Sequence, residues 1–145
     1  MRILSVSILL SKDIRVFLLI LSFFRRTELN LEEFIRCQDI IYVGGGNTAN
    51  LLAVWRLHGL DRVLRKAYVE GTVLSGISAG AACWFESCLT DSFGRLEALN
   101  DGLGILPGSF CPHFNTEPGR PRRFLQTLQS GTLPPGVALD DGAAG

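Results

Sequence analysis

The sequence predicts an α/β fold in which a parallel sheet carries helices on both faces. Short apolar runs typical of buried strands alternate with stretches of helical periodicity, and glycines separate them. The 145 residues fit a single domain, residues 1–145, and a hydrophobic content of 47% suffices for a core. Lys and Arg together number 14, as do Asp and Glu, which excludes the basic surface of a nucleic-acid-binding protein.

Residues 1–36 form an atypical hydrophobic N-terminal segment. Its longest apolar run, Val16–Phe24, is similar to the apolar stretch of a signal peptide, but a bilayer span needs about 20 residues. Charged residues flank the run, and no small-residue cleavage site follows it. We therefore expect two buried strands separated by Ser11–Asp13, in a cytoplasmic protein that does not bind membranes.

The middle of the chain alternates between helical and strand patterns. Apolar residues recur at helical spacing from Leu29 to Ile35, with two glutamates in the first turns, where the helix dipole favours acids. The apolar run Asp39–Val43 ends in three glycines, as a central parallel strand does. Two helices and a second buried strand follow, and a glycine ends each helix. These elements are Thr48–His58, Leu60–Glu70 and Thr72–Gly76.

The pattern changes after the second buried strand. Residues Ile77–Phe85 are expected to turn into a helix, and after Glu86 the chain is expected to be rich in turns. A further helix is predicted at Pro121–Leu128, and a strand begins at Val137–Leu139.

A Gly-x-Ser-x-Gly sequence, Gly76–Gly80, lies between a predicted strand and a predicted helix. This is the context of a nucleophile elbow, in which a sharp turn exposes a serine hydroxyl at the carboxyl edge of a sheet. The glycines leave room where a side chain would collide with neighbouring backbone. Ser78 is therefore the candidate nucleophile, although a tight structural turn explains the same residues.

A serine nucleophile needs a base, most often histidine. His113 lies in a turn-rich stretch, where functional residues are frequent, whereas His58 closes a helix and has an ordinary structural explanation. The acid that would orient the base is one of Asp91, Asp140 and Asp141, and spacing alone does not choose among them.

The glycine turn Gly44–Ala49 has two interpretations. As G-x-G-x-x-A between a strand and a helix it could hold a pyrophosphate, but the acid at the expected distance, Glu70, precedes its strand and falls at the wrong edge of the sheet. Alternatively, the turn supplies one N–H group of an oxyanion hole beside Ser78.

The four cysteines carry no metal or redox motif. They lack the C-x-x-C spacing, and only two histidines are present to complete a metal site. We expect reduced and mostly buried thiols. They are Cys37, Cys83, Cys88 and Cys111.

Four motifs together resemble the aspartyl dipeptidase (peptidase E) and cyanophycinase family of serine peptidases. They are Ile41–Thr48, Gly76–Ala81, Thr90–Asp91 and Pro112–Phe114. The resemblance implies a flavodoxin-like sheet related to class I glutaminase domains. It also implies a shortened member, because relatives usually have a longer region before the glycine turn and further strands at the C-terminus.

The resemblance assigns roles to individual residues. It implies Ser78 as nucleophile and His113 as base, with the N–H groups of Gly46 and Ala79 as the oxyanion hole. Asp141 falls where the family carries the acid that orients the histidine, and Asp91 matches a second acidic position and is the alternative.

The constellation predicts a serine peptidase that hydrolyses small peptides, without metal or organic cofactor, as a monomer or homodimer. The resemblance implies dipeptidase-like activity, with aspartyl dipeptides as one candidate substrate. Three arginines after His113 could recognise a substrate carboxylate, although a solvated basic stretch explains them equally well. They are Arg120, Arg122 and Arg123. The alternative function is a truncated, inactive family member that acts at most as an interaction module.

Overall fold

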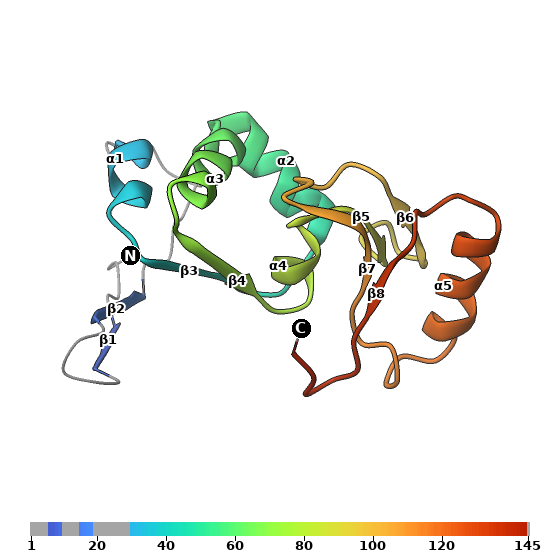
Figure 1. Ribbon diagram of the computed structural model, residues 1–145. Coiled ribbons are helices and arrows are strands. Elements are labelled where there is room, and N and C mark those ends of the chain that lie inside the picture. The colour runs from blue at the N-terminus through green and yellow to red at the C-terminus, as the bar shows by residue number, and fades with distance from the viewer. Residues whose placement is uncertain (1–5, 10–14, 19–29, 145) are drawn as a thin grey trace.

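The computed structural model describes residues 6–9, 15–18 and 30–144 (Figure 1). Strands β1 (Val6–Leu9) and β2 (Arg15–Leu18) pair antiparallel, which confirms the two strands predicted around Ser11–Asp13. The rest of the apolar run Val16–Phe24, residues 19–24, lies outside the described residues. No helix in the described part of the chain is long and apolar enough to cross a membrane.

The helices and strands predicted between Leu31 and Gly76 are all present, and the helices pack on a pair of parallel strands. Strands β3 and β4 pair in register, with Ile40 opposite Val73. The elements are α1 (Leu31–Arg36), β3 (Ile40–Val43), α2 (Thr48–His58), α3 (Leu60–Val69) and β4 (Val73–Gly76).

Local sequence sets the ends of these helices. The side chain of Asn47 accepts a hydrogen bond from the Asn50 N–H at 2.9 Å and thereby caps the start of α2. Gly59 ends α2 and precedes α3 with a φ angle of 71°, a left-handed conformation that costs glycine little.

Among the residues that the structure describes, helices cover one face of the β3–β4 pair. Ile41, Val43 and Leu74 pack against the buried residues of α1, α2 and α3. On the other face Ile40 is 54% and Tyr42 63% exposed, so β3 is not buried on both faces as a central strand would be. The continuous apolar run predicted a strand buried on both faces, but in the described part of the chain the face that carries Ile40 and Tyr42 is exposed.

After the β3–β4 pair the chain forms a second sheet with parallel strands, which has four strands in the order β6-β5-β7-β8. Strands β5, β7 and β8 are parallel, and β6 is antiparallel to β5. The sheet comprises β5 (Phe85–Thr90), β6 (Glu97–Leu99), β7 (Leu106–Cys111) and β8 (Gly136–Ala138).

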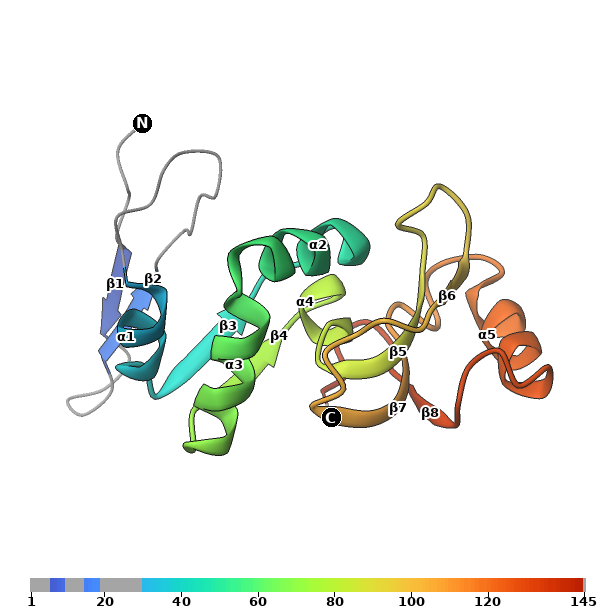
Figure 2. The same cartoon turned by 90° about the horizontal axis from the view of Figure 1, so that it is seen from above.

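Helices cover both faces of this second sheet, as Figures 1 and 2 show from two directions. On one face, Phe124 of α5 (Arg120–Gln129) packs against Leu89 and Cys111. On the other, Ala82 of α4 (Ala79–Ala82) packs against Cys88 and Phe110. The α/β class is confirmed, with the parallel strands distributed over two sheets.

Two predictions for residues 77–107 are wrong. The helix after Ser78 ends at Ala82 instead of reaching Phe85, and the stretch expected to be rich in turns contains β5, β6 and the start of β7. The Trp84 carbonyl accepts hydrogen bonds from the N–H groups of Ile105 and Leu106 at 2.8 and 2.9 Å. Pairing with residues about 20 positions away thus draws this segment into the sheet, and no local pattern reports it.

The prediction for the cysteines is confirmed. All four are free thiols, of which Cys83, Cys88 and Cys111 are buried and Cys37 is exposed.

Candidate active site

Ser78 occupies the sharp turn between β4 and α4. Its backbone has φ 53° and ψ −117°, a conformation that non-glycine residues rarely adopt. The Ile77 N–H donates to the Val43 carbonyl at 3.1 Å, so the turn is attached to the end of β3. This is the strand–turn–helix geometry expected of a nucleophile elbow.

The glycines on either side of Ser78 are required by close backbone contacts. A Cβ atom on Gly76 would lie 2.2 Å from the Gly80 carbonyl oxygen, and one on Gly80 would lie 2.2 Å from the Val43 carbonyl oxygen. Both separations are far below van der Waals contact. The Gly-x-Ser-x-Gly pattern therefore lets the short helix approach the strand ends.

Parallel strands β7 and β8 bring His113 and Asp141 to the same sheet edge. Cys111 is paired with Ala138 at the ends of the two strands, and His113 and Asp141 follow two and three residues later. The Phe114 N–H extends this pairing by donating to the Leu139 carbonyl at 3.0 Å.

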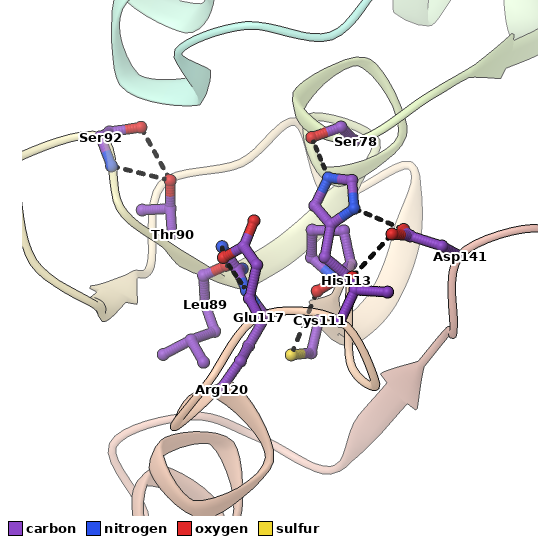
Figure 3. A network of polar contacts seen from close by, with 11 residues as sticks. Ser78, Leu89, Thr90, Ser92, Cys111, His113, Glu117, Arg120 and Asp141 are labelled. Atoms are coloured by element: carbon purple, nitrogen blue, oxygen red, sulfur yellow. Dashed lines mark hydrogen bonds and ion pairs between the residues drawn. The ribbon is translucent and has the colours of Figure 1, made fainter.

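His113 lies between Ser78 and Asp141 and contacts both through its ring nitrogens (Figure 3). Its Nε2 is 2.9 Å from Ser78 Oγ, and its Nδ1 is 2.5 Å from Asp141 Oδ1. His113 also has a positive φ angle, 55°. The structure therefore brings together three residues that are separated by 35 and 28 positions in the sequence.

Two further residues hold Asp141, and sequence reasoning missed both. The Thr116 hydroxyl donates to Asp141 Oδ2 at 2.6 Å, and the Asn115 side-chain oxygen accepts from the Asp141 N–H at 3.1 Å. The hydrogen bond from Thr116, followed by that from His113, holds the pKa of the Asp141 carboxyl below its ordinary value. The carboxylate is therefore ionised at neutral pH.

The ionised Asp141 fixes the tautomer of His113. A carboxylate only accepts hydrogen bonds, so Nδ1 carries the proton of the neutral ring and Nε2 is left as an acceptor. The Ser78 hydroxyl then donates to Nε2. In this arrangement an imidazole can take the proton of a serine hydroxyl.

The N–H groups of Gly46 and Ala79 are not used in the hydrogen bonding of the described chain. Neither donates a hydrogen bond to any other described residue. A Cβ atom on Gly45 would lie 3.4 Å from Ser78 Cβ, so the glycine turn after β3 lies directly against the serine. Ala79 immediately follows Ser78 as the first residue of α4.

The glycine turn is anchored by Ser92, in the loop after β5. The Asn47 amide donates to the Ser92 carbonyl at 2.9 Å, and Ser92 Oγ accepts from the Ala49 N–H at 3.2 Å. Ser92 Oγ also lies 2.7 Å from the Thr90 hydroxyl. These contacts connect the start of α2 with the end of β5. The Thr90–Asp91 motif pointed to this region, but the sequence alone could not show that Ser92 contacts Asn47 and Ala49.

Other residues singled out in the sequence are placed apart from this constellation. Asp91 is exposed after β5 and has no hydrogen bond to His113, whose two nitrogens contact Ser78 and Asp141. His58 is the last residue of α2. Glu70 pairs with Arg36 at 2.8 Å, which leaves the glycine turn without the acid that a dinucleotide site needs.

Arg120 is not available to bind a substrate carboxylate. It is 2% exposed, and its guanidinium pairs with Glu117 and donates to the Leu89 carbonyl at 3.3 Å. Arg123 donates to the Leu96 carbonyl at 3.1 Å. Both arginines therefore hold the loops beside the sheet. Among the residues that the structure describes, no group of three or more His, Cys, Asp or Glu side chains could hold a metal ion.

Comparison with known proteins yields one family and several relatives. Residues 4–144 match the model of peptidase family S51. The chain is 50% identical over 124 residues to the uncharacterized peptidase YgaJ of Bacillus subtilis (strain 168), a match covering 86% of this chain and 54% of that protein. It is 32% identical over 119 residues to Peptidase E of Shewanella sp. (strain W3-18-1), covering 76% of this chain and 50% of that protein.

A solved structure shares the fold. A protein from Listeria monocytogenes EGD-e, provisionally called peptidase E, superimposes with a TM-score of 0.54 at 26% identity, covering 66% of this chain and 52% of that one. The α/β fold and the resemblance found in the sequence are thereby confirmed. The chain spans about half the length of the curated relatives that it matches.

Proposed function

The chain belongs to peptidase family S51, and on that premise we propose that it is a serine-type peptidase that hydrolyses small peptides. One observation supports the proposal above all others: a continuous chain of hydrogen bonds runs from Ser78 through His113 to Asp141. A serine hydroxyl, a base that can take its proton and an acid that orients the base are the parts that acyl transfer requires.

In the proposed reaction Ser78 Oγ attacks the carbonyl carbon of the scissile peptide bond while His113 Nε2 takes the hydroxyl proton. Asp141 stabilises the resulting imidazolium. When the tetrahedral intermediate collapses, the C–N bond breaks and His113 gives the proton to the leaving amine. A water molecule, deprotonated by His113, then attacks the acyl-enzyme ester and releases the carboxylic acid and Ser78.

The negative oxygen of each tetrahedral intermediate would be stabilised by the N–H groups of Gly46 and Ala79. Their lack of other acceptors among the described residues and the contact between Gly45 and Ser78 support this role. Donors already fixed in place need no reorganisation during the reaction, and loss of one typically costs about 10²–10³ in rate.

Dipeptides are the first substrates to test, because several relatives carry the name peptidase E and the sequence resembles the aspartyl dipeptidases. An N-terminal aspartyl side chain carries a carboxylate, which a cation near the site would recognise. Of the arginines that follow His113, Arg120 is buried and paired. Arg122 is exposed on α5 and has no described partner. Both acidic and neutral N-terminal residues therefore belong in the substrate panel.

The experiment measures release of free leucine from Asp-Leu and Ala-Leu by the parent chain, Ser78→Ala and Ser130→Ala. Ser130 is an exposed serine at the end of α5 and serves as the control for loss of a hydroxyl. We expect hydrolysis by the parent and by Ser130→Ala, and none above background by Ser78→Ala. Equal hydrolysis by Ser78→Ala would refute serine catalysis, and a folded parent without turnover would support the inactive interaction module.

A further inference from the structure

The acid of the constellation lies on an exposed segment that no strand holds. Strand β8 ends at Ala138, and residues 140–144 are exposed. The Asp141 side chain itself is 48% exposed. A carboxylate in this position would be free to turn toward water unless other contacts fixed it.

Those contacts come from the turn that carries the base. The backbone N–H groups of Thr116 and Glu117 donate to the His113 carbonyl at 3.4 and 3.3 Å, which closes the turn on His113. The same turn provides the Asn115 oxygen for the Asp141 N–H and the Thr116 hydroxyl for Asp141 Oδ2. Base and acid are therefore held relative to each other by one five-residue stretch.

The two carboxylate oxygens of Asp141 have separate partners. Oδ1 contacts His113 Nδ1 (Figure 3), and Oδ2 accepts the Thr116 hydroxyl proton at 2.6 Å. Because the carboxylate is planar, two hydrogen bonds on opposite oxygens fix its rotation about the Cβ–Cγ bond. Removing one bond would let the carboxylate rotate away from the imidazole.

We propose that Thr116 is a positioning residue for catalysis, which aligns Asp141 with His113 while Asn115 anchors the backbone of the acid. The proposal rests on the proposed peptidase function and adds to it a residue whose hydroxyl contacts Asp141 and neither Ser78 nor the His113 ring. A reacting group misplaced by about 1 Å can lose about two orders of magnitude in rate. Loss of the Thr116 hydroxyl should therefore lower kcat about 10–100-fold and leave KM within about twofold.

The test compares Thr116→Val, which keeps the shape of the side chain, with Thr116→Ser, which keeps the hydroxyl. Hydrolysis kinetics are combined with proton NMR of the hydrogen-bonded Nδ1–H of His113, assigned by its loss in His113→Gln. We expect Thr116→Val to lower kcat. When the pH is lowered, Thr116→Val should also lose the Nδ1–H signal at a higher pH than the parent does, because Asp141 without the Thr116 hydrogen bond is protonated more readily. Thr116→Ser should restore both kcat and the signal.

Parent-like kinetics and an unchanged Nδ1–H signal in Thr116→Val would overturn the proposal, as would failure of Thr116→Ser to restore the signal. The NMR signal reports the contact between His113 and Asp141 and needs no turnover, so it is also measured in Ser78→Ala. Failure of the positioning role is therefore distinguished from failure of serine catalysis, which the hydrolysis assay of Ser78→Ala detects.

Discussion

The Oγ of Ser78 lies 2.9 Å from Nε2 of His113, and these two are the non-glycine residues with positive φ angles in the described ranges. Such conformations cost about 1–3 kcal/mol each and persist only where the surrounding structure enforces them. The close backbone contacts of Gly76 and Gly80 hold Ser78, and the turn after β7 holds His113. The strained backbone is thus concentrated at the two residues that would exchange a proton.

Replacing the acids one at a time tests which of them orients His113. In Asp141→Asn the amide can present an N–H to Nδ1, which favours the tautomer whose Nε2 carries the proton and no longer accepts from Ser78. We expect kcat to fall about 10⁴-fold. Asp91 does not contact His113, so the kcat of Asp91→Asn should stay within about threefold of that of the parent in the same dipeptide assay. A larger loss in Asp91→Asn than in Asp141→Asn would contradict the assignment.

The pH dependence of stability should report the lowered pKa of Asp141. A carboxyl group with a pKa below its unfolded value stabilises the fold above that unfolded value, about 3.9 for Asp. The contribution is lost as the pH falls through the lowered pKa. The parent should therefore melt at a higher temperature than Asp141→Asn near neutral pH, and the two melting temperatures should converge as the pH falls below about 4. A difference that persists undiminished well below pH 4 would contradict this.

A methyl group on Gly80 should disrupt the junction between β3 and α4. Its Cβ atom would lie 2.2 Å from the Val43 carbonyl oxygen and 2.6 Å from the Gly44 carbonyl oxygen. We expect Gly80→Ala to lower the free energy of unfolding in urea by about 1–3 kcal/mol or more. Gly44→Ala is the matched control, because its Cβ atom would meet nothing within 4 Å. Equal stability of the two variants would show that the contact at Gly80 is relieved without cost.

Cys37 should react with a thiol reagent in the native chain, whereas the other three cysteines should not. Burial raises the pKa of Cys88 to about 12 and that of Cys111 to about 11, and it also raises the pKa of Cys83. Because the thiolate is the reactive form, we expect Ellman's reagent to titrate one thiol in the native chain and four after unfolding. Rapid reaction of two or more thiols under native conditions would contradict the burial of Cys83, Cys88 and Cys111.

Sequence patterns predicted the elements whose signals are local. Glycines at the ends of α2 and α3 marked where both helices stop, and the Gly-x-Ser-x-Gly turn between β4 and α4 was recognisable because its steric requirement lies within five residues. Strand β7 was concealed, since Pro107 and Gly108 near its start are typical of turns although a strand tolerates them at its beginning.

Long-range features were beyond local patterns. The choice between Asp91 and Asp141 depends on the pairing of β7 with β8, which no spacing reports. Arg120 could be interpreted as a substrate ligand because its burial and its pairing with Glu117 emerge only when α5 packs on the sheet. The exposed face of β3 likewise follows from helices packing on one side only.

The central claim, that Ser78 is a nucleophile activated by His113, is tested most directly with a fluorophosphonate, which transfers its phosphonyl group to an activated serine oxygen and releases fluoride. Intact mass spectrometry of the full chain should show one adduct in the parent and in Ser130→Ala, and none in Ser78→Ala or His113→Ala. An adduct that persists in Ser78→Ala, or a folded parent that never acquires one, would contradict the account.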